Sequence, residues 1–319
     1  MTRIRIIALL LASAGLGQGV GAFAAAGALD TGDSAADQPC PYELIVLGAG
    51  QDAGAPQIGN SDDDGPRLLP SSLALIDRTE GKRYLFDASP AITEQLAMLD
   101  TILPPEDGAG LGIDGVFLTH AHIGHYLGLA YLGREAAGAA GVPVYAMPRM
   151  AGFLRGNGPW SQLVELGNID LRPVESGTEL AGGLLVSPIK VPHRDEYSET
   201  VGFMITQPSG VSAVYLPDID YWPDDGFVQE LIHYPDMWFL DASFWDDNEL
   251  PGRDMSEIPH PRVTETMDLL QHMPDEARAM VNFIHYNHTN PIRYPDSPEA
   301  REVAARGFSI ARRGDRFCL

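Results

Sequence analysis

The sequence has few cysteines and little positive charge, and its mean hydropathy is low. Cys40 and Cys318 are the only cysteines among 319 residues, and neither lies in a CxxC pair, which excludes the common zinc-finger and dithiol redox motifs. Lys and Arg number 21 against 44 Asp and Glu, a net charge of −23. Because such a chain repels phosphate backbones, we expect no nucleic-acid partner. A mean hydropathy of −0.08 excludes a polytopic membrane protein.

The first residues have the features of a secretory signal peptide. Arg3 and Arg5 precede an apolar run, and the small residues after that run offer a cleavage site behind Ala24. This order predicts a leader over residues 1–24 and a periplasmic or secreted protein. An uncleaved anchor is the alternative, because the weakly apolar stretch is long enough to cross a bilayer. We expect cleavage, and hence no stable membrane insertion of the mature protein.

The segment between the leader and the first strand predicts a flexible lead-in. Residues 25–41 are rich in Gly, Ala and Asp, and the folded domain is expected at 42–319. In an exported protein Cys40 and Cys318 can form a disulfide that joins the two ends of this domain. Two unpaired thiols are the alternative.

Strand-like and helix-like runs alternate along the rest of the chain. Apolar runs predict strands at 42–47, 72–76, 84–86, 116–118, 142–146, 184–191, 202–206, 213–216, 237–240 and 280–284. Helical patterns lie at 91–99, 125–139, 148–155, 226–233, 262–272 and 297–306. Such alternation favours an α/β fold in which helices cover sheets.

Three histidines follow directly on one of these strands. His120, His122 and His125 fall within six residues, although the whole chain has only nine histidines. In an extended backbone His120 and His122 point the same way, and His125 projects from the first turn of the next helix. Strand ends are where α/β sheets expose functional groups, so we expect a metal site here rather than three unrelated surface histidines.

Later strand ends offer further ligands for a metal ion. The strand at 184–191 is followed by His193, the strand at 213–216 by Asp218, and the strand at 280–284 by His285. A metal site needs groups that converge from separate elements, and this repeated placement provides them. His288 is a second candidate in the last of these loops.

This order of motifs resembles the metallo-β-lactamase superfamily, whose pattern is HxHxxH after a strand, then a lone His, a lone Asp and a final His. The resemblance implies a four-layer αββα sandwich with its metal site between the sheet edges. Within the superfamily, the chain is similar to the branch of pyrroloquinoline quinone biosynthesis protein B over most of the mature sequence. The motifs that carry this similarity are residues 47–50, 55–57, 71–74, 86–90, 118–125 with 128–129, 241–245 and 285–291.

The chain departs from these relatives at two places. Members of the superfamily typically have the motif HxHxDH, whereas this chain has Gly124 in place of the Asp. The second metal position therefore lacks one carboxylate ligand. We therefore expect one tightly bound Zn²⁺ and a second ion that is held loosely if it binds. Residues 60–65 contain none of the cysteines of the biosynthesis protein, so its structural zinc is not expected.

The site implies metal-assisted hydrolysis. The expected metal ligands are His120, His122, His125, His193, Asp218 and His285. His120, His122 and His193 would hold the first ion, and Asp218 would orient a water molecule whose pKa the ion lowers to about 7. The resulting hydroxide would attack a small ester, lactone, amide or phosphoester, and His288 or His260 would stabilise the oxyanion or protonate the leaving group.

Two other functions agree with the same residues. Imidazoles and a carboxylate also suit Fe²⁺, and a mononuclear iron site would make the protein an oxygenase or hydroxylase, as the resemblance to the biosynthesis protein implies. A non-catalytic metal-binding protein is the third possibility. The sequence identifies neither the small-molecule substrate nor the oligomeric state.

Overall fold

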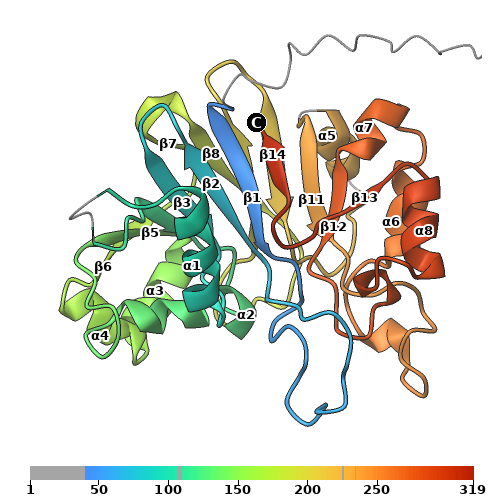
Figure 1. Cartoon of the computed structure of the whole chain (residues 1–319), viewed down its shortest axis with the longest axis horizontal. Coiled ribbons are helices and arrows are strands. Elements are labelled where there is room, and N and C mark those ends of the chain that lie inside the picture. The colour runs from blue at the N-terminus through green and yellow to red at the C-terminus, as the bar shows by residue number, and fades with distance from the viewer. Residues whose placement is uncertain (1–39, 107–109, 225, 234) are drawn as a thin grey trace, which may run out of the picture. The chain divides into compact units, whose positions relative to one another are not determined.

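The computed structural model describes residues 40–106, 110–224, 226–233 and 235–319, which belong to one unit from Cys40 to Leu319. The expected signal peptide at 1–24 and the lead-in up to residue 39 lie outside the described residues. Among the residues described, no helix is both long and apolar enough to cross a membrane. The unit is a sandwich of two seven-stranded sheets (Figure 1).

The first sheet has the strand order β14-β1-β2-β3-β4-β5-β6. Its strands are β1 (Tyr42–Gly48), β2 (Ser72–Asp77), β3 (Lys82–Phe86), β4 (Gly115–Phe117), β5 (Val142–Ala146), β6 (Ile169–Pro173) and β14 (Arg316–Cys318). Neighbours from β14 to β3 pair antiparallel, and neighbours from β3 to β6 pair parallel.

The second sheet has the order β13-β12-β11-β10-β9-β8-β7. Its strands are β7 (Thr178–Glu179), β8 (Leu185–Lys190), β9 (Val201–Thr206), β10 (Ser212–Leu216), β11 (Met237–Asp241), β12 (Val281–Ile284) and β13 (Ser309–Ile310). Strands β10 to β13 are parallel, so β10, β11 and β12 all end at the same edge of the sheet.

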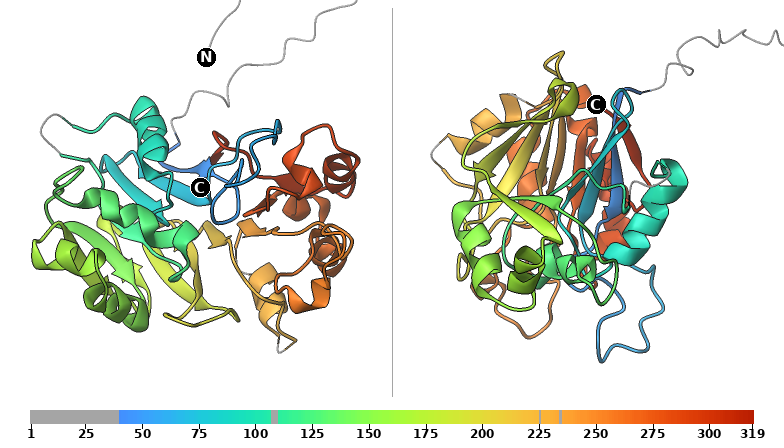
Figure 2. Two further views of the ribbon diagram at one scale, coloured as in Figure 1. Left: turned by 90° about the horizontal axis from the view of Figure 1, so that it is seen from below. Right: turned by 90° about the vertical axis from the view of Figure 1, so that its left-hand side faces the viewer.

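Helices cover the outer faces of both sheets. The α-helices are α1 (Ile92–Ile102), α2 (Ile123–Tyr126), α3 (Pro148–Gly156), α4 (Trp160–Glu165), α5 (Phe227–His233), α6 (Val263–Leu270), α7 (Asp275–Ala279) and α8 (Pro298–Ala305). Short 3₁₀ helices lie at Leu127–Leu132, Ala181–Gly183, Met255–Glu257 and Pro291–Arg293. Helix α1 packs on β1, α3 and α4 pack on β6, and α7 and α8 pack on β12 and β13 (Figure 2). The expected αββα sandwich is confirmed.

Aromatic side chains fill the space between the two sheets next to the histidine motif. Phe86 of β3 stacks on Phe117 of β4 with ring centroids 5.1 Å apart. Both rings meet Phe203 of β9 in the opposite sheet, at 5.7 and 5.5 Å. All three rings are buried, and such pairs contribute about 0.5–1.5 kcal/mol each beyond their burial. This packing fixes the position of the strands that deliver the histidines.

The helix that the sequence predicts at 125–139 is much shorter in the structure. Helix α2 passes into a 3₁₀ helix at Leu127–Leu132, and Gly133 ends it. A Cβ atom on Gly128 would lie 2.2 Å from the carbonyl oxygen of Ser89, so this turn packs directly against the loop after β3. The sequence patterns also miss β6, in which buried and exposed residues alternate, and α7, which buries no side chain.

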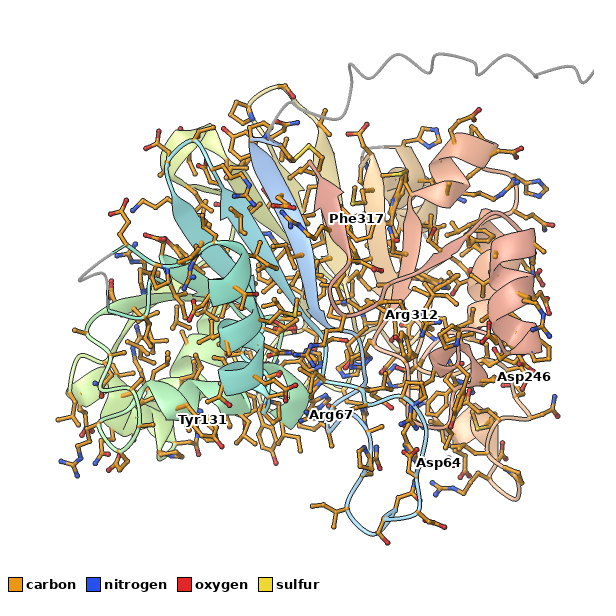
Figure 3. All side chains as sticks on the ribbon, in the orientation of Figure 1. Asp64, Arg67, Tyr131, Asp246, Arg312 and Phe317 are labelled. Atoms are coloured by element: carbon orange, nitrogen blue, oxygen red, sulfur yellow. A yellow bond between two sulfur atoms is a disulfide. The ribbon has the colours of Figure 1, made fainter. Side chains whose placement is uncertain are left out.

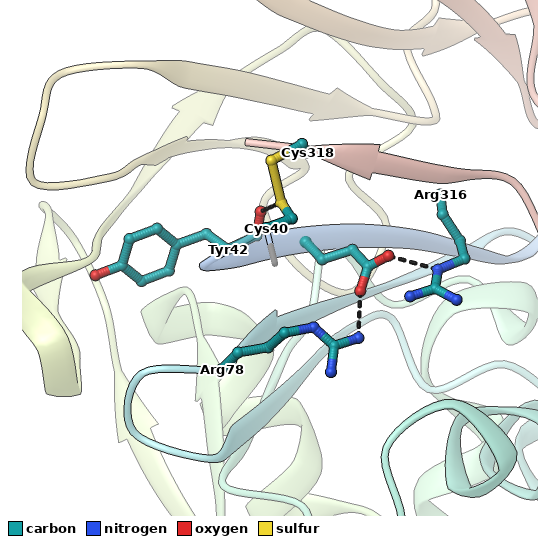
Figure 4. Close-up of a disulfide and its surroundings, with 6 residues drawn as sticks. Cys40, Tyr42, Arg78, Arg316 and Cys318 are labelled. Carbon is teal, nitrogen blue, oxygen red and sulfur yellow. Dashed lines mark hydrogen bonds and ion pairs between the residues drawn. A yellow bond between two sulfur atoms is a disulfide. The ribbon is translucent and has the colours of Figure 1, made fainter. Parts of the chain in front are cut away.

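A disulfide joins the two ends of the described unit. Cys40, just before β1, is bonded to Cys318 of β14, and their Cα atoms are 5.5 Å apart (Figure 4). Beside it the buried Glu43 carboxylate forms ion pairs with Arg78 and Arg316. Burial alone would raise the pKa of Glu43, but the two guanidinium groups outweigh it and hold the pKa below its usual value. The edge of the first sheet is therefore fixed both covalently and electrostatically.

We expect the double variant Cys40→Ser, Cys318→Ser to have a free energy of unfolding about 2 to 5 kcal/mol lower than the wild type, because the bridge closes a loop with a sequence separation of 278. Urea unfolding of the oxidised wild type, the variant and the wild type in reductant measures this difference. The reduced wild type serves as the control and should match the variant. Equal unfolding midpoints for all three samples would contradict the expectation.

Candidate metal centre

The ends of several strands deliver imidazoles and carboxylates to one edge of the sandwich, the lower edge in Figure 1, where α2 lies. The structure brings together all six expected ligands there. One group of ligand atoms comes from His120, His122, His193 and Asp218, another from His125, His285 and Asp52, and a third from Asp218, Asp241, His260 and His285. Within each group the ligand atoms lie within 4.8 Å of one another.

The first group has the spacing of a tetrahedral metal site. His122 Nδ1 lies 2.9 Å from His120 Nε2 and 3.0 Å from His193 Nε2. Asp218 Oδ2 lies 3.2 Å from His120 Nε2 and 3.3 Å from His193 Nε2. Metal–nitrogen bonds of 2.0–2.1 Å in a tetrahedron place neighbouring ligand atoms about 3.3 Å apart. These four atoms therefore fit around one divalent ion.

Each imidazole of this group is held through its other ring nitrogen. His120 Nδ1 lies 3.0 Å from the Thr119 hydroxyl, and His193 Nδ1 lies 2.7 Å from Asp220 Oδ1. His122 is turned round, so that its Nε2 lies 3.1 Å from Glu196 Oε2. Such partners are usual for histidines that bind metals, since they fix the orientation of the ring and increase its basicity.

Two further imidazoles point buried nitrogen atoms into the same centre. His125 Nδ1 lies 2.7 Å from Asp87 Oδ2, and His285 Nδ1 lies 3.1 Å from the Ser243 hydroxyl. The Nε2 atoms of both rings are buried and have no hydrogen-bond partner. A buried polar atom without a partner costs about 1–3 kcal/mol. A cation bound between these atoms would remove that cost, so the residues fit a metal ion.

Asp87 is a buried carboxylate that the sequence analysis did not select as a site residue. It follows β3 and accepts hydrogen bonds from the backbone N–H of Thr119 and from the hydroxyl of Tyr215. Burial disfavours a charge on His125, but the Asp87 carboxylate outweighs this and raises the pKa of His125 to about 9. The negative field that favours this proton also favours a cation at the ring. Asp87 could have been selected from the sequence because it lies in the motif at residues 86–90, which is shared with the related branch.

His260 lies beside the bridging position of Asp218. Its Nδ1 is 2.8 Å from Asp241 Oδ2 and 3.3 Å from Asp218 Oδ1. Asp241 also accepts hydrogen bonds from the backbone N–H groups of Ile219 and Ser243. Burial would lower the pKa of His260, but the two carboxylates outweigh it and raise the pKa to about 9. Asp241 ends β11 just as Asp218 follows β10, and this placement is a signal that the sequence analysis missed.

His288 is not brought into the centre. Its Nδ1 lies 2.8 Å from the side-chain oxygen of its neighbour Asn287, and burial lowers its pKa below the usual value. The ring is therefore held within its own loop and is poorly suited to carry a proton at neutral pH. We withdraw His288 as a candidate acid for the leaving group, and His260 stays a candidate.

Comparisons with known proteins show the family to which the chain belongs. The sequence profile of the Beta-lactamase superfamily domain matches residues 82–286. The chain belongs to this superfamily. It is 29% identical to the coenzyme PQQ synthesis protein B of Ruegeria pomeroyi over 301 residues, covering 85% of this chain and 98% of that protein. The corresponding protein of Cupriavidus necator is 27% identical and covers 74% and 83%. The expected similarity to this branch is thus confirmed.

Solved structures show the same fold. Zn²⁺-bound PqqB from Methylobacterium extorquens superposes with a TM-score of 0.72 at 22% identity, covering 87% of this chain and all of that one. A diphosphatase of the PhnP family gives a TM-score of 0.61 at 23% identity, covering 87% and 98%. Human tRNase Z, short form, gives 0.55 at 16% identity, covering 86% and 98%. Proteins with this fold thus include a Zn²⁺-bound PqqB, a diphosphatase and a tRNase Z.

We expect His120→Ala or His193→Ala to remove the tightly bound metal ion, because each change takes one of three imidazoles from the first ligand group. Metal content after dialysis against a weak chelator, measured by inductively coupled plasma mass spectrometry, checks this. His288→Ala is the matched control and should keep its metal. A full equivalent of metal retained by either of the first two variants would refute the ligand assignment.

Proposed function

We propose that the protein is an exported metal-dependent hydrolase that acts on a small ester, lactone, amide or phosphoester. The observation that carries this proposal is the first ligand group, three imidazoles and Asp218 within tetrahedral spacing, with the His260–Asp241 pair directly beside it. Zn²⁺ is the metal we propose, because the donors are mostly imidazole nitrogens and the related PqqB structure contains zinc. The net charge of −23 favours a small substrate over a nucleic acid.

A divalent ion held by this group would supply Lewis acidity. By accepting a water molecule in addition to the four protein ligands, it would lower the pKa of that water towards neutrality. Asp218 faces the ligand nitrogens with Oδ2, and its Oδ1 faces His260. This carboxylate can therefore orient the attacking water, while its Oδ1 lies against the charged His260 ring. The partners Thr119 and Asp220 keep the imidazoles of His120 and His193 in place.

His260 is suited to protonate the leaving group. Asp241 Oδ2 holds the Nδ1 side of the ring, so a proton on Nε2 of the charged imidazole remains for transfer to the substrate. Asp241 is itself fixed by two backbone N–H groups, and this keeps the ring oriented. A positioned acid of this kind contributes about 10² to 10⁴ in rate.

A second candidate is an iron-dependent oxygenase. It is favoured by the curated relatives named coenzyme PQQ synthesis protein B and by the ligands, since imidazoles and a carboxylate also suit Fe²⁺. A non-catalytic metal-binding protein is distinguished by the absence of turnover. Hydrolysis remains our first proposal because the site pairs a complete ligand group with a held proton donor.

Export is supported by the leader pattern at residues 1–24 and by the disulfide, since structural disulfides persist in oxidising compartments. We expect the protein recovered from its native host to begin near Ala25, and mass spectrometry of the N-terminal peptide checks this. Recovery with Met1 intact would argue for the uncleaved anchor instead.

To test the reaction, we would incubate the mature, periplasmically expressed protein with an ester, a lactone, a lactam and a phosphodiester, with and without oxygen. We expect turnover of at least one substrate that does not depend on oxygen. His260→Gln should lower kcat by roughly 10² to 10⁴ while the metal content stays unchanged, because only the proton donor is lost. His272→Gln, at an exposed position, is the control. Oxygen-dependent turnover, or wild-type kcat in His260→Gln, would count against the proposal.

A further inference from the structure

The space beside Gly124 is already filled by the backbone and carboxylate of another residue. A Cβ atom at position 124 would lie 2.6 Å from the Cα atom of Asp52 and 2.9 Å from its Oδ1. Asp52 belongs to the loop after β1, far from the histidine motif in sequence. The position where HxHxDH places a carboxylate is therefore closed to any side chain at residue 124, and an Asp side chain from a different loop occupies this volume.

The Asp52 carboxylate lies near two imidazoles, those of His125 and His285, whose Nε2 atoms lack hydrogen-bond partners. Ligand atoms of Asp52, His125 and His285 lie within 4.8 Å of one another. Oδ1 of Asp52 and Nε2 of both rings are buried without a hydrogen-bond partner, and the two histidines are at most 1% exposed. Polar atoms buried in this way are paired in almost all proteins. One cation between them would satisfy all three atoms.

The loop is built to hold Asp52 in this place. The N–H of Gln51 donates to the carbonyl of Tyr286, and the N–H of Tyr286 donates to the carbonyl of Ala49, so the loop is bonded to the residue that follows His285. A turn closed by the N–H of Gly54 and the carbonyl of Gln51 surrounds Asp52. Asp52 has φ +36, a left-handed conformation that Asp tolerates better than most residues.

We propose that Asp52 supplies the carboxylate of a second divalent-metal site, together with His125, His285 and the shared Asp218. Asp218 Oδ2 lies 3.8 Å from His125 Nε2, which links the new site to the first ligand group. The site takes a Zn²⁺-type ion, because its donors are two imidazoles and carboxylate oxygens. This inference deepens the metal-dependent function proposed above and rests on it, and it replaces our sequence-based expectation of a second position without its carboxylate.

The test counts metal ions in the full mature chain. Protein stripped of metal is loaded with Zn²⁺, dialysed, and titrated with a competing chelator for wild type, Asp52→Asn and Asp52→Ala. We expect two equivalents in the wild type, and loss of one or at least a roughly tenfold weaker second equivalent in both variants. Asp64→Asn is the matched control, since Asp64 is exposed on the same loop (Figure 3) and should leave both equivalents unchanged.

Gly124→Ala tests the same site without changing any ligand. Its methyl group would collide with the backbone at Asp52, so the loop must move and the second equivalent should weaken while the first stays bound. Retention of the first equivalent in all variants shows that they are folded. If Asp52→Ala binds two equivalents of Zn²⁺ with wild-type affinity, the proposal is overturned. The proposal is also overturned if the wild type binds a single equivalent of Zn²⁺ and His120→Ala removes it. A wild type without any bound ion would instead refute the metal-dependent function itself.

Discussion

The structure depends most on the need to compensate negative charge buried between the two sheets. Asp87, Asp218 and Asp241 are 0%, 4% and 0% exposed. A buried carboxylate is costly unless it is paired and hydrogen-bonded, and each of these three faces at least one imidazole. Burial would raise the pKa of Asp218, but the histidines around it hold the pKa well below its usual range. The same concentration of negative charge is what a divalent cation requires.

The fold meets this need by joining both sheets at the site. Asp87 follows β3 of the first sheet and accepts a hydrogen bond from Tyr215 of β10 in the second, while it also holds Thr119 and His125. The backbone N–H of Val201 donates to the carbonyl of Thr119 and adds a second link. A substitution of Asp87 would therefore affect both the orientation of the His125 imidazole and the contact between the two sheets. The hydrogen bonds of Asp87 thus both hold the two sheets together and orient an expected metal ligand.

The sequence predicts those parts of the site that depend on local order. The HxHxxH segment and the polar residues after β8, β10 and β12 were predictable, because parallel strands carry their carboxyl ends to one edge. The place of Asp52 was not predictable, since it depends on how a loop after β1 packs against α2. Asp52, Asp87, His260 and His285 all have positive φ, and no residue pattern indicates such a backbone for non-glycine residues. His288 lies close in sequence to His285, yet the turn directs it elsewhere.

We expect residues from both sheets to hold metal at this edge. The most direct measurement is an anomalous difference map from crystals of the mature protein grown with Zn²⁺ and recorded on both sides of the zinc absorption edge. We expect one peak surrounded by His120, His122, His193 and Asp218, and a second peak in contact with Asp52, His125 and His285. A map in which the first position shows no peak at full Zn²⁺ loading would contradict this expectation.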